Sequence, residues 1–137
     1  MRNLMNTNVY DVSETLVIVG SCLERMQPKA FEELKKFSND ILDVCLEREH
    51  LNMVITKIMG MISRVNVKKI VFATVDKSPH CVQLHYVMKE LEKGMDLSGI
   101  EIVDYVAVND ELVEIPMDVI SLSKNLSELN EKYKEIL

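Results

Sequence analysis

The chain has 137 residues, of which 47% are hydrophobic and 28% charged, and this fits one globular domain with one apolar core. Its net charge is −6 at pH 7, and it contains no block of Lys and Arg. Because phosphate neutralisation needs clustered basic side chains, we expect neither nucleic acid nor an acidic membrane surface as a partner.

The N-terminus is polar and has no apolar run of the kind found in a signal peptide. We expect residues 1–11 to form a polar arm on a single α/β domain that comprises residues 1–137. No apolar run approaches the length of a membrane span, which predicts a cytoplasmic protein. The three cysteines are odd in number and widely spaced, which argues against a disulfide framework.

The first expected element is a buried strand over residues 15–19, a short and fully apolar run that ends at a glycine. A helix should follow from Pro28 to about residue 48, because apolar side chains recur there at helical spacing. Cys45 lies on the apolar face of this helix, so we expect it in the core.

Residues 50–65 carry apolar side chains on one helical face, and we favour a helix there. Gly60 and the β-branched residues weaken that prediction, which leaves a strand over residues 53–58 as the alternative. A second buried strand is expected over residues 69–75. A helix over residues 79–93 follows it and closes at a glycine.

A third strand is expected over residues 100–108, and Asn109-Asp110 forms a two-residue turn after it. Residues 111–115 then return as an antiparallel strand until a proline stops them. The last helix should run from about residue 118 to 136, with apolar residues alternately four and three apart. That seam can pack on the sheet or on another subunit, so a homo-oligomer is one expectation.

Strands separated by helices predict an α/β fold, namely a three-layer, mostly parallel sheet with helices on both faces and an antiparallel edge hairpin. Ligands bind such open sheets beyond the carboxyl ends of the strands. Three stretches should meet there: Gly20-Ser21-Cys22, Asp76 to His85, and Asn109-Asp110-Glu111. Cys22 and Cys81 can approach each other if the first two strands are neighbours.

The loop after the second strand carries most of the reactive side chains. Ser78 is a good N-cap and Pro79 suits the first helical position, which places His80 and Cys81 in the first turn. Free N–H groups and the helix dipole favour a thiolate on Cys81 there. His85 follows one helical turn later, so Cys81 and His85 are the candidate catalytic pair. An inert cysteine on the core side of the helix is the alternative.

Backbone N–H groups after the first two strands also suit an anionic or nucleotide-like ligand. The residues assigned to such a ligand are Gly20, Ser21, Cys22, Asp76, Ser78 and His80. Neither loop is a Walker A or GxGxxG motif, so no particular cofactor follows. The cysteines and histidines of these loops match no recognised spacing of zinc or iron–sulfur ligands, so we predict no metal site.

Residues 68–80, Lys-Lys-Ile-Val-Phe-Ala-Thr-Val-Asp-Lys-Ser-Pro-His, resemble the opening strand and loop of universal stress proteins, which read as an apolar strand, Val-Asp-Gly-Ser and a helix. With the following strand, the resemblance covers about residues 68–108. It implies that Asp76 matches the aspartate that contacts adenine in ATP-binding members. Lys77 stands where the family has glycine, and no glycine-rich phosphate motif follows Gly99.

Three functions are therefore open. A small binding or regulatory protein for an anionic or nucleotide-like ligand ranks first, because no catalytic constellation is complete. A thiol-dependent or sulfur-handling protein would use Cys81, with Cys22 as partner and His85 as base. A structural or interaction protein without a ligand is the third, and the heptad-like last helix supports it.

Overall fold

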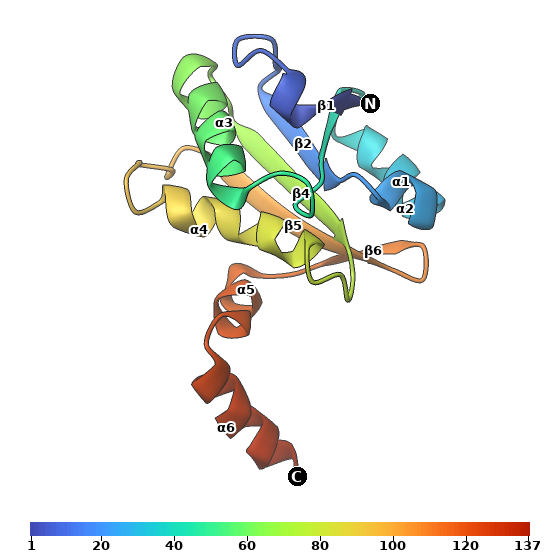
Figure 1. The fold of residues 1–137 in the computed structure, drawn as a ribbon, viewed down its shortest axis with the longest axis vertical. Helices are drawn as coiled ribbons and strands as arrows, with labels where there is room; N and C mark the ends of the chain where they lie inside the picture. The colour runs from blue at the N-terminus through green and yellow to red at the C-terminus, as the bar shows by residue number, and fades with distance from the viewer.

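The computed structural model describes residues 1–137 and contains one six-stranded sheet in the order β1-β3-β2-β4-β5-β6 (Figure 1). All neighbours are parallel except the β5–β6 hairpin. The strands are β1 (Arg2–Asn3), β2 (Thr15–Gly20), β3 (Ile41–Val44), β4 (Lys69–Val75), β5 (Glu101–Val108) and β6 (Glu111–Glu114). The predicted α/β class, with a mostly parallel sheet and an antiparallel edge hairpin, is confirmed.

Helices cover both faces of the sheet. The α-helices are α1 (Leu23–Met26), α2 (Pro28–Glu33), α3 (Leu51–Arg64), α4 (Val87–Leu91), α5 (Met117–Ser123) and α6 (Leu126–Ile136). The 3-10 helices are η1 (Leu4–Asn6), η2 (Leu34–Lys36) and η3 (Cys81–Tyr86). α3 and α4 cover one face, and α1 and α2 cover the other (Figure 1). Ile18 and Phe72 share a core cluster with residues of α3 and α4, whereas Val19 and Val71 share a second cluster with residues of α1 and α2. Because both faces are buried, β2 and β4 are apolar apart from Thr15 and Lys69 at their amino ends and Thr74.

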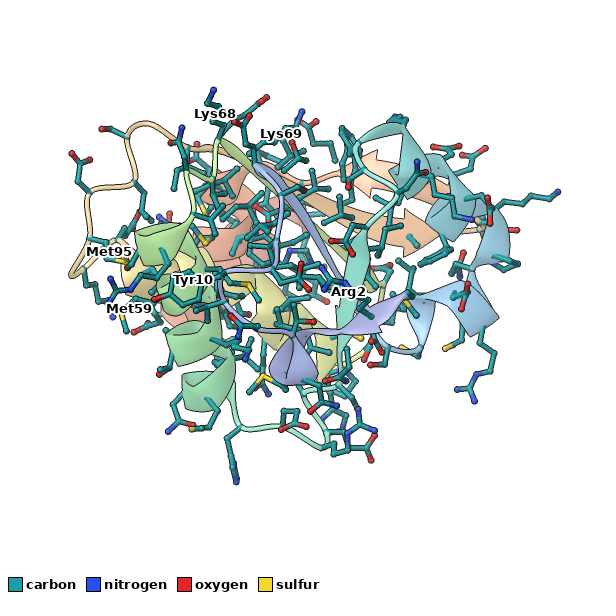
Figure 2. All side chains as sticks on the ribbon, turned by 90° about the horizontal axis from the view of Figure 1, so that it is seen from above. Arg2, Tyr10, Met59, Lys68, Lys69 and Met95 are labelled. Carbon is teal, nitrogen blue, oxygen red and sulfur yellow. The ribbon has the colours of Figure 1, made fainter.

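The N-terminal residues are part of the sheet, which corrects the polar arm expected over residues 1–11. Arg2 pairs with Leu42 across β1 and β3, and Leu4 is completely buried, at 0% exposure. The Arg2 guanidinium, beside the teal strand β3 in Figure 2, donates from Nε to Asp40 Oδ1 at 2.9 Å. The segment pairs with the free edge of β3, and a two-residue strand is too short to leave a pattern in the sequence.

The helix predicted over residues 28–48 is wrong in its second half. Helical structure ends at Lys36, and residues 41–44 form β3. The Asp40 N–H is bound by Ser38 Oγ at 3.1 Å, which turns the chain before the strand. Ile41, Leu42 and Val44 are buried in the sheet, so these apolar residues serve a strand rather than a helix face. Cys45 therefore follows a strand and does not lie in a helix core.

The other elements up to the hairpin are close to expectation. α3 confirms the helix preferred over residues 50–65 and excludes the alternative strand, and β4 has the predicted bounds. Of the helix expected over residues 79–93, the structure forms only the part from Cys81 to Leu91. Residues 81–86 of this part are a 3-10 helix, η3, and residues 87–91 are the α-helix α4. Asn109 and Asp110 have φ values of 50° and 65°, which confirms the two-residue turn.

The last helix is divided into α5 and α6. The Asn125 side chain accepts from Glu128 N at 3.2 Å and so begins a separate helix. α6 has no buried residue and points away from the sheet (Figure 1), so its apolar seam does not pack on the domain. No helix in the structure combines the length and apolar composition that crossing a bilayer requires.

Candidate functional site

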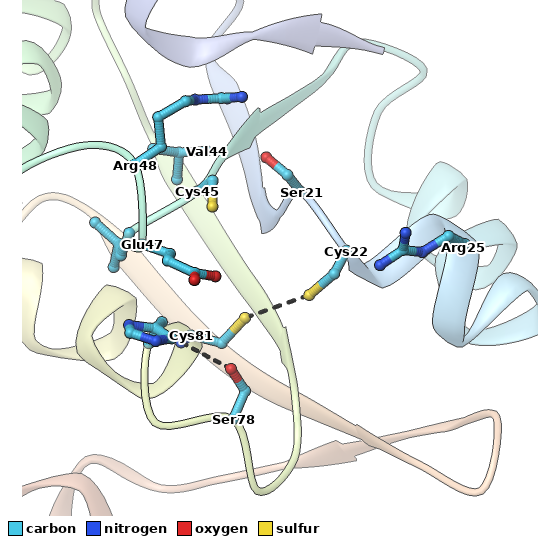
Figure 3. Close-up of a pocket in the computed structure, with 11 residues that line it drawn as sticks. Ser21, Cys22, Arg25, Val44, Cys45, Glu47, Arg48, Ser78 and Cys81 are labelled. Atoms are coloured by element: carbon cyan, nitrogen blue, oxygen red, sulfur yellow. Dashed lines mark hydrogen bonds between the residues drawn. The ribbon is translucent and has the colours of Figure 1, made fainter.

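A cavity of about 390 Å³ opens beyond the carboxyl ends of β2, β3 and β4. Figure 3 shows the residues that line it. From β2 the chain moves to β3 on one side, and then through α3 to β4 on the other side. The reversal makes the ends of β2 and β4 the topological switch point, where open α/β sheets bind ligands. The cavity is lined by Ser21, Cys22, Arg25, Val44, Cys45, Leu46, Glu47, Arg48, Ser78, His80 and Cys81.

Two cysteine thiols meet in this cavity. Cys22 follows β2 and Cys81 begins η3, and their Sγ atoms are 3.6 Å apart (Figure 3). Since β2 and β4 are neighbours, the predicted approach of these cysteines is confirmed. A Cβ atom on Gly20 would lie 2.8 Å from Cys81 Sγ, so any larger residue there would displace this sulfur. Burial, and then the neighbouring Cys81 thiol, raise the pKa of Cys22 to about 11.

A third cysteine lines the same cavity. Cys45 follows β3, and its negative charge when ionised further opposes ionisation of Cys22. The helical spacing of its neighbours conceals the short strand, which is why the prediction of Cys45 in a helix core is wrong. Reading Ile41-Leu42-Asp43-Val44 as a strand with a polar side chain at one position would have placed Cys45 at the sheet edge.

The cavity carries an excess of positive charge in an acidic chain. Arg25 from α1 and Arg48 from the loop after β3 line it together with His80, and Glu47 is the single carboxylate among the lining residues. Arg25 forms no ion pair or side-chain hydrogen bond within the chain, and Arg48 has only a 3.7 Å contact to Glu49. Sequence reasoning missed both arginines, since neither belongs to a recognised motif.

Some of the backbone N–H groups that we expect to bind an anion already donate hydrogen bonds within the chain. Ser21 N donates to Val44 O at 3.0 Å, and Cys81 N donates to Ser78 Oγ at 3.1 Å. The second bond closes the turn before η3, but η3 begins at Cys81 with His80 at its N-cap position, so the prediction of Ser78 as N-cap and Pro79 as first helical residue is wrong. The Ser21 hydroxyl donates to Asp43 Oδ2 at 2.7 Å. The side chains of Arg25 and Arg48 therefore leave more hydrogen-bond donors free in this cavity than these backbone amides do.

His85 faces the core rather than Cys81. Its Nε2 lies 2.7 Å from Thr74 Oγ1 and its Nδ1 2.8 Å from Asp104 Oδ1, so both ring nitrogens are engaged. In a 3-10 helix, residues four apart lie about 120° apart around the axis, against about 40° in an α-helix. The structure therefore does not bring His85 to Cys81. Thr74 is only 1% exposed, so this hydroxyl–imidazole–carboxylate chain is a buried network, and His85 lines a smaller cavity of about 170 Å³ rather than the one that holds Cys81.

The remaining predicted site residues lie elsewhere. Asp76 is exposed beside a smaller cavity of about 170 Å³, and its N–H donates to Ala107 O. Lys77 has a φ of 68°, a conformation that glycine adopts more easily. The Asp110 carboxylate accepts from Lys29 N at 2.8 Å and so caps α2, which removes the third loop from the cavity.

No group of three or more His, Cys, Asp or Glu side chains is arranged to hold a metal ion. Fold and site together define a doubly wound α/β domain with a cavity at its switch point. A family model described as a Rossmann-like domain matches residues 12–136, and the chain belongs to this family. The matching family model is not that of universal stress proteins. The resemblance of residues 68–108 to that family is therefore supported only as far as the Rossmann-like fold. No curated protein and no solved structure matches the chain.

Proposed function

We propose that this is a small cytoplasmic binding or regulatory protein that holds an anionic or nucleotide-like ligand in the switch-point cavity. The observation that carries the proposal is the pair Arg25 and Arg48, which line the cavity from different segments without a strong partner in the chain. Guanidinium groups bind carboxylates and phosphates through paired hydrogen bonds. A volume of about 390 Å³ lies within the range of small-molecule sites.

The ligand contact implied by the universal stress protein resemblance does not enter this proposal. Asp76 does not line the switch-point cavity, so it offers no contact to an adenine held there. The recognised part of the ligand is its phosphate or carboxylate group.

Native mass spectrometry on protein purified without air tests the proposal, with AMP and inorganic pyrophosphate as added probes. We expect a saturable adduct that is lost on denaturation, and a tenfold or greater loss of affinity in Arg25→Gln/Arg48→Gln. The matched control is Arg64→Gln/Lys68→Gln, which removes two exposed positive charges near the amino ends of the strands (Lys68 is labelled in Figure 2). Equal binding by both double variants would overturn the proposal.

A thiol-dependent function is the second candidate, because the Cys22 and Cys81 sulfurs are 3.6 Å apart. Its expected base, His85, is bound to Thr74 and Asp104 instead. Any thiol chemistry at this site must therefore proceed without that imidazole.

A further inference from the structure

We propose that the cavity is a site of thiol–disulfide exchange, in which Cys22 and Cys81 reduce a small disulfide whose carboxylates are held by Arg25 and Arg48. The inference rests on the proposed anion site and names the class of ligand for it. It requires that the two thiols lie close together, that one of them attacks the substrate first, and that the cavity favours a negatively charged substrate.

The thiol pair is close enough to form a bond through side-chain movement. A disulfide is about 2.0 Å long, and the two Sγ atoms are 3.6 Å apart although the residues are 59 positions apart in the chain. Gly20 provides the space that the Cys81 sulfur occupies, since a Cβ atom there would be 2.8 Å from it. The bond would link the segment that follows β2 to the first residue of η3.

The environments of the two thiols set the order of attack. Burial keeps the pKa of Cys22 near 11, so this thiol is protonated at neutral pH. A protonated Cys22 can donate its S–H to a thiolate on Cys81, which is its hydrogen-bond partner. Cys81 is therefore the attacking sulfur, and Cys22 resolves the intermediate.

The reaction balances without a further oxidant. The Cys81 thiolate attacks one sulfur of the disulfide RSSR, and a Cys81–S–S–R bond forms as the first RS⁻ leaves. That leaving thiolate takes the proton of Cys22. The Cys22 sulfur then attacks Cys81 Sγ and releases the second RS⁻, which takes the proton that Cys81 lost at the start. The products are the Cys22–Cys81 disulfide and two RSH.

The charges of the cavity select among disulfides. Arg25 and Arg48 attract a carboxylate-bearing substrate, and Glu47 is the only lining carboxylate to oppose it. We expect an anionic disulfide to react about tenfold faster than a neutral one of similar length at low ionic strength, and a cationic one to react slowest.

The experiment uses the reduced full-length protein and three disulfides matched in size: 3,3′-dithiodipropionate, 2-hydroxyethyl disulfide and cystamine. Intact mass should fall by two hydrogens, and peptide mapping should place the bond between Cys22 and Cys81. Cys22→Ala should accumulate a mixed disulfide on Cys81. Cys45→Ala is the matched control and should still close the bond, because the 3.6 Å sulfur contact joins Cys22 and Cys81 alone. A disulfide that includes Cys45, or Cys22 and Cys81 thiols that remain reduced with all three probes, would overturn the proposed exchange.

The arginine variants separate the two proposals. Arg25→Gln/Arg48→Gln should close the bond at similar rates with all three disulfides. If the wild type also shows equal rates, the anion site fails, and the substrate class fails with it. If AMP binds but no disulfide forms, the exchange alone is contradicted.

Discussion

Cys81 and His85 are four residues apart in one helical segment, yet they occupy opposite kinds of environment. Cys81 lines the switch-point cavity beside a second thiol, whereas His85 is 3% exposed, is bonded through both ring nitrogens and lines a different, smaller cavity. The residue types alone suggest that both belong to one site. The difference teaches that two reactive side chains close in sequence share one site only where the backbone turns both toward the same cavity.

Removing the Asp104 carboxylate should have the largest effect on stability. Asp104→Ala leaves His85 Nδ1 buried without its partner, which should cost about 1–3 kcal/mol in the free energy of unfolding. Urea unfolding measures the loss, and Glu101→Ala, on the exposed side of the same strand, should change it by less than about 0.5 kcal/mol. The alkylation rate of the cavity cysteines should stay unchanged. A parallel fall in that rate would show that the two regions are not separate.

Gly20→Ala should affect the cavity and leave the core network intact. The new Cβ displaces the Cys81 sulfur, with a loss of about 1 kcal/mol in stability and a lower pKa for Cys22, because Cys81 no longer opposes its ionisation. The pH dependence of iodoacetamide alkylation, followed by peptide mapping, reports that pKa. Gly99→Ala, whose Cβ would meet no atom within 4 Å, is the control. An unchanged Cys22 pKa in Gly20→Ala would refute the close packing of the pair.

The raised pKa of Cys22 also predicts a change of stability with pH. Its thiol ionises near 9 in the unfolded chain and near 11 in the folded one, so the folded state binds more protons between these values. The contribution is fully present below pH 9 and is lost as the pH rises to about 11. Urea midpoints should therefore fall more steeply over this window in the wild type than in Cys22→Ala. Tyr105, whose pKa burial also raises, contributes equally to both proteins. Identical slopes would contradict the assignment.

The smallest effect is expected at α6, which contributes to neither the cavity nor the core. Deleting residues 126–137 should change the free energy of unfolding by less than about 0.5 kcal/mol, because α6 has no buried residue. Light scattering on the same two proteins tests the homo-oligomer expected from its apolar seam. Self-association that survives the deletion would remove the support that α6 gives to an interaction role.

The sequence predicts the parts of the site that follow from long apolar runs. β2 and β4 each contain a run of at least four consecutive apolar residues, and their adjacency brings Cys22 to Cys81 as expected. β3 is only four residues long and its apolar residues also fit a helical period, so Cys45 and Arg48 were not assigned to the cavity. The inward turn of His85 depends on a 3-10 rather than an α-helical segment, and side-chain spacing cannot distinguish the two.

The most direct measurement is a titration of the reduced, isotope-labelled protein with AMP, followed by amide chemical shifts. If the switch-point cavity binds anions, saturable shifts will concentrate in three segments, residues 21–25, 45–48 and 78–81, and will disappear in Arg25→Gln/Arg48→Gln. Saturable shifts confined instead to the α5–α6 cavity around Asp118 and Lys132, or shifts that persist in the arginine variant, would contradict a functional site at the switch point.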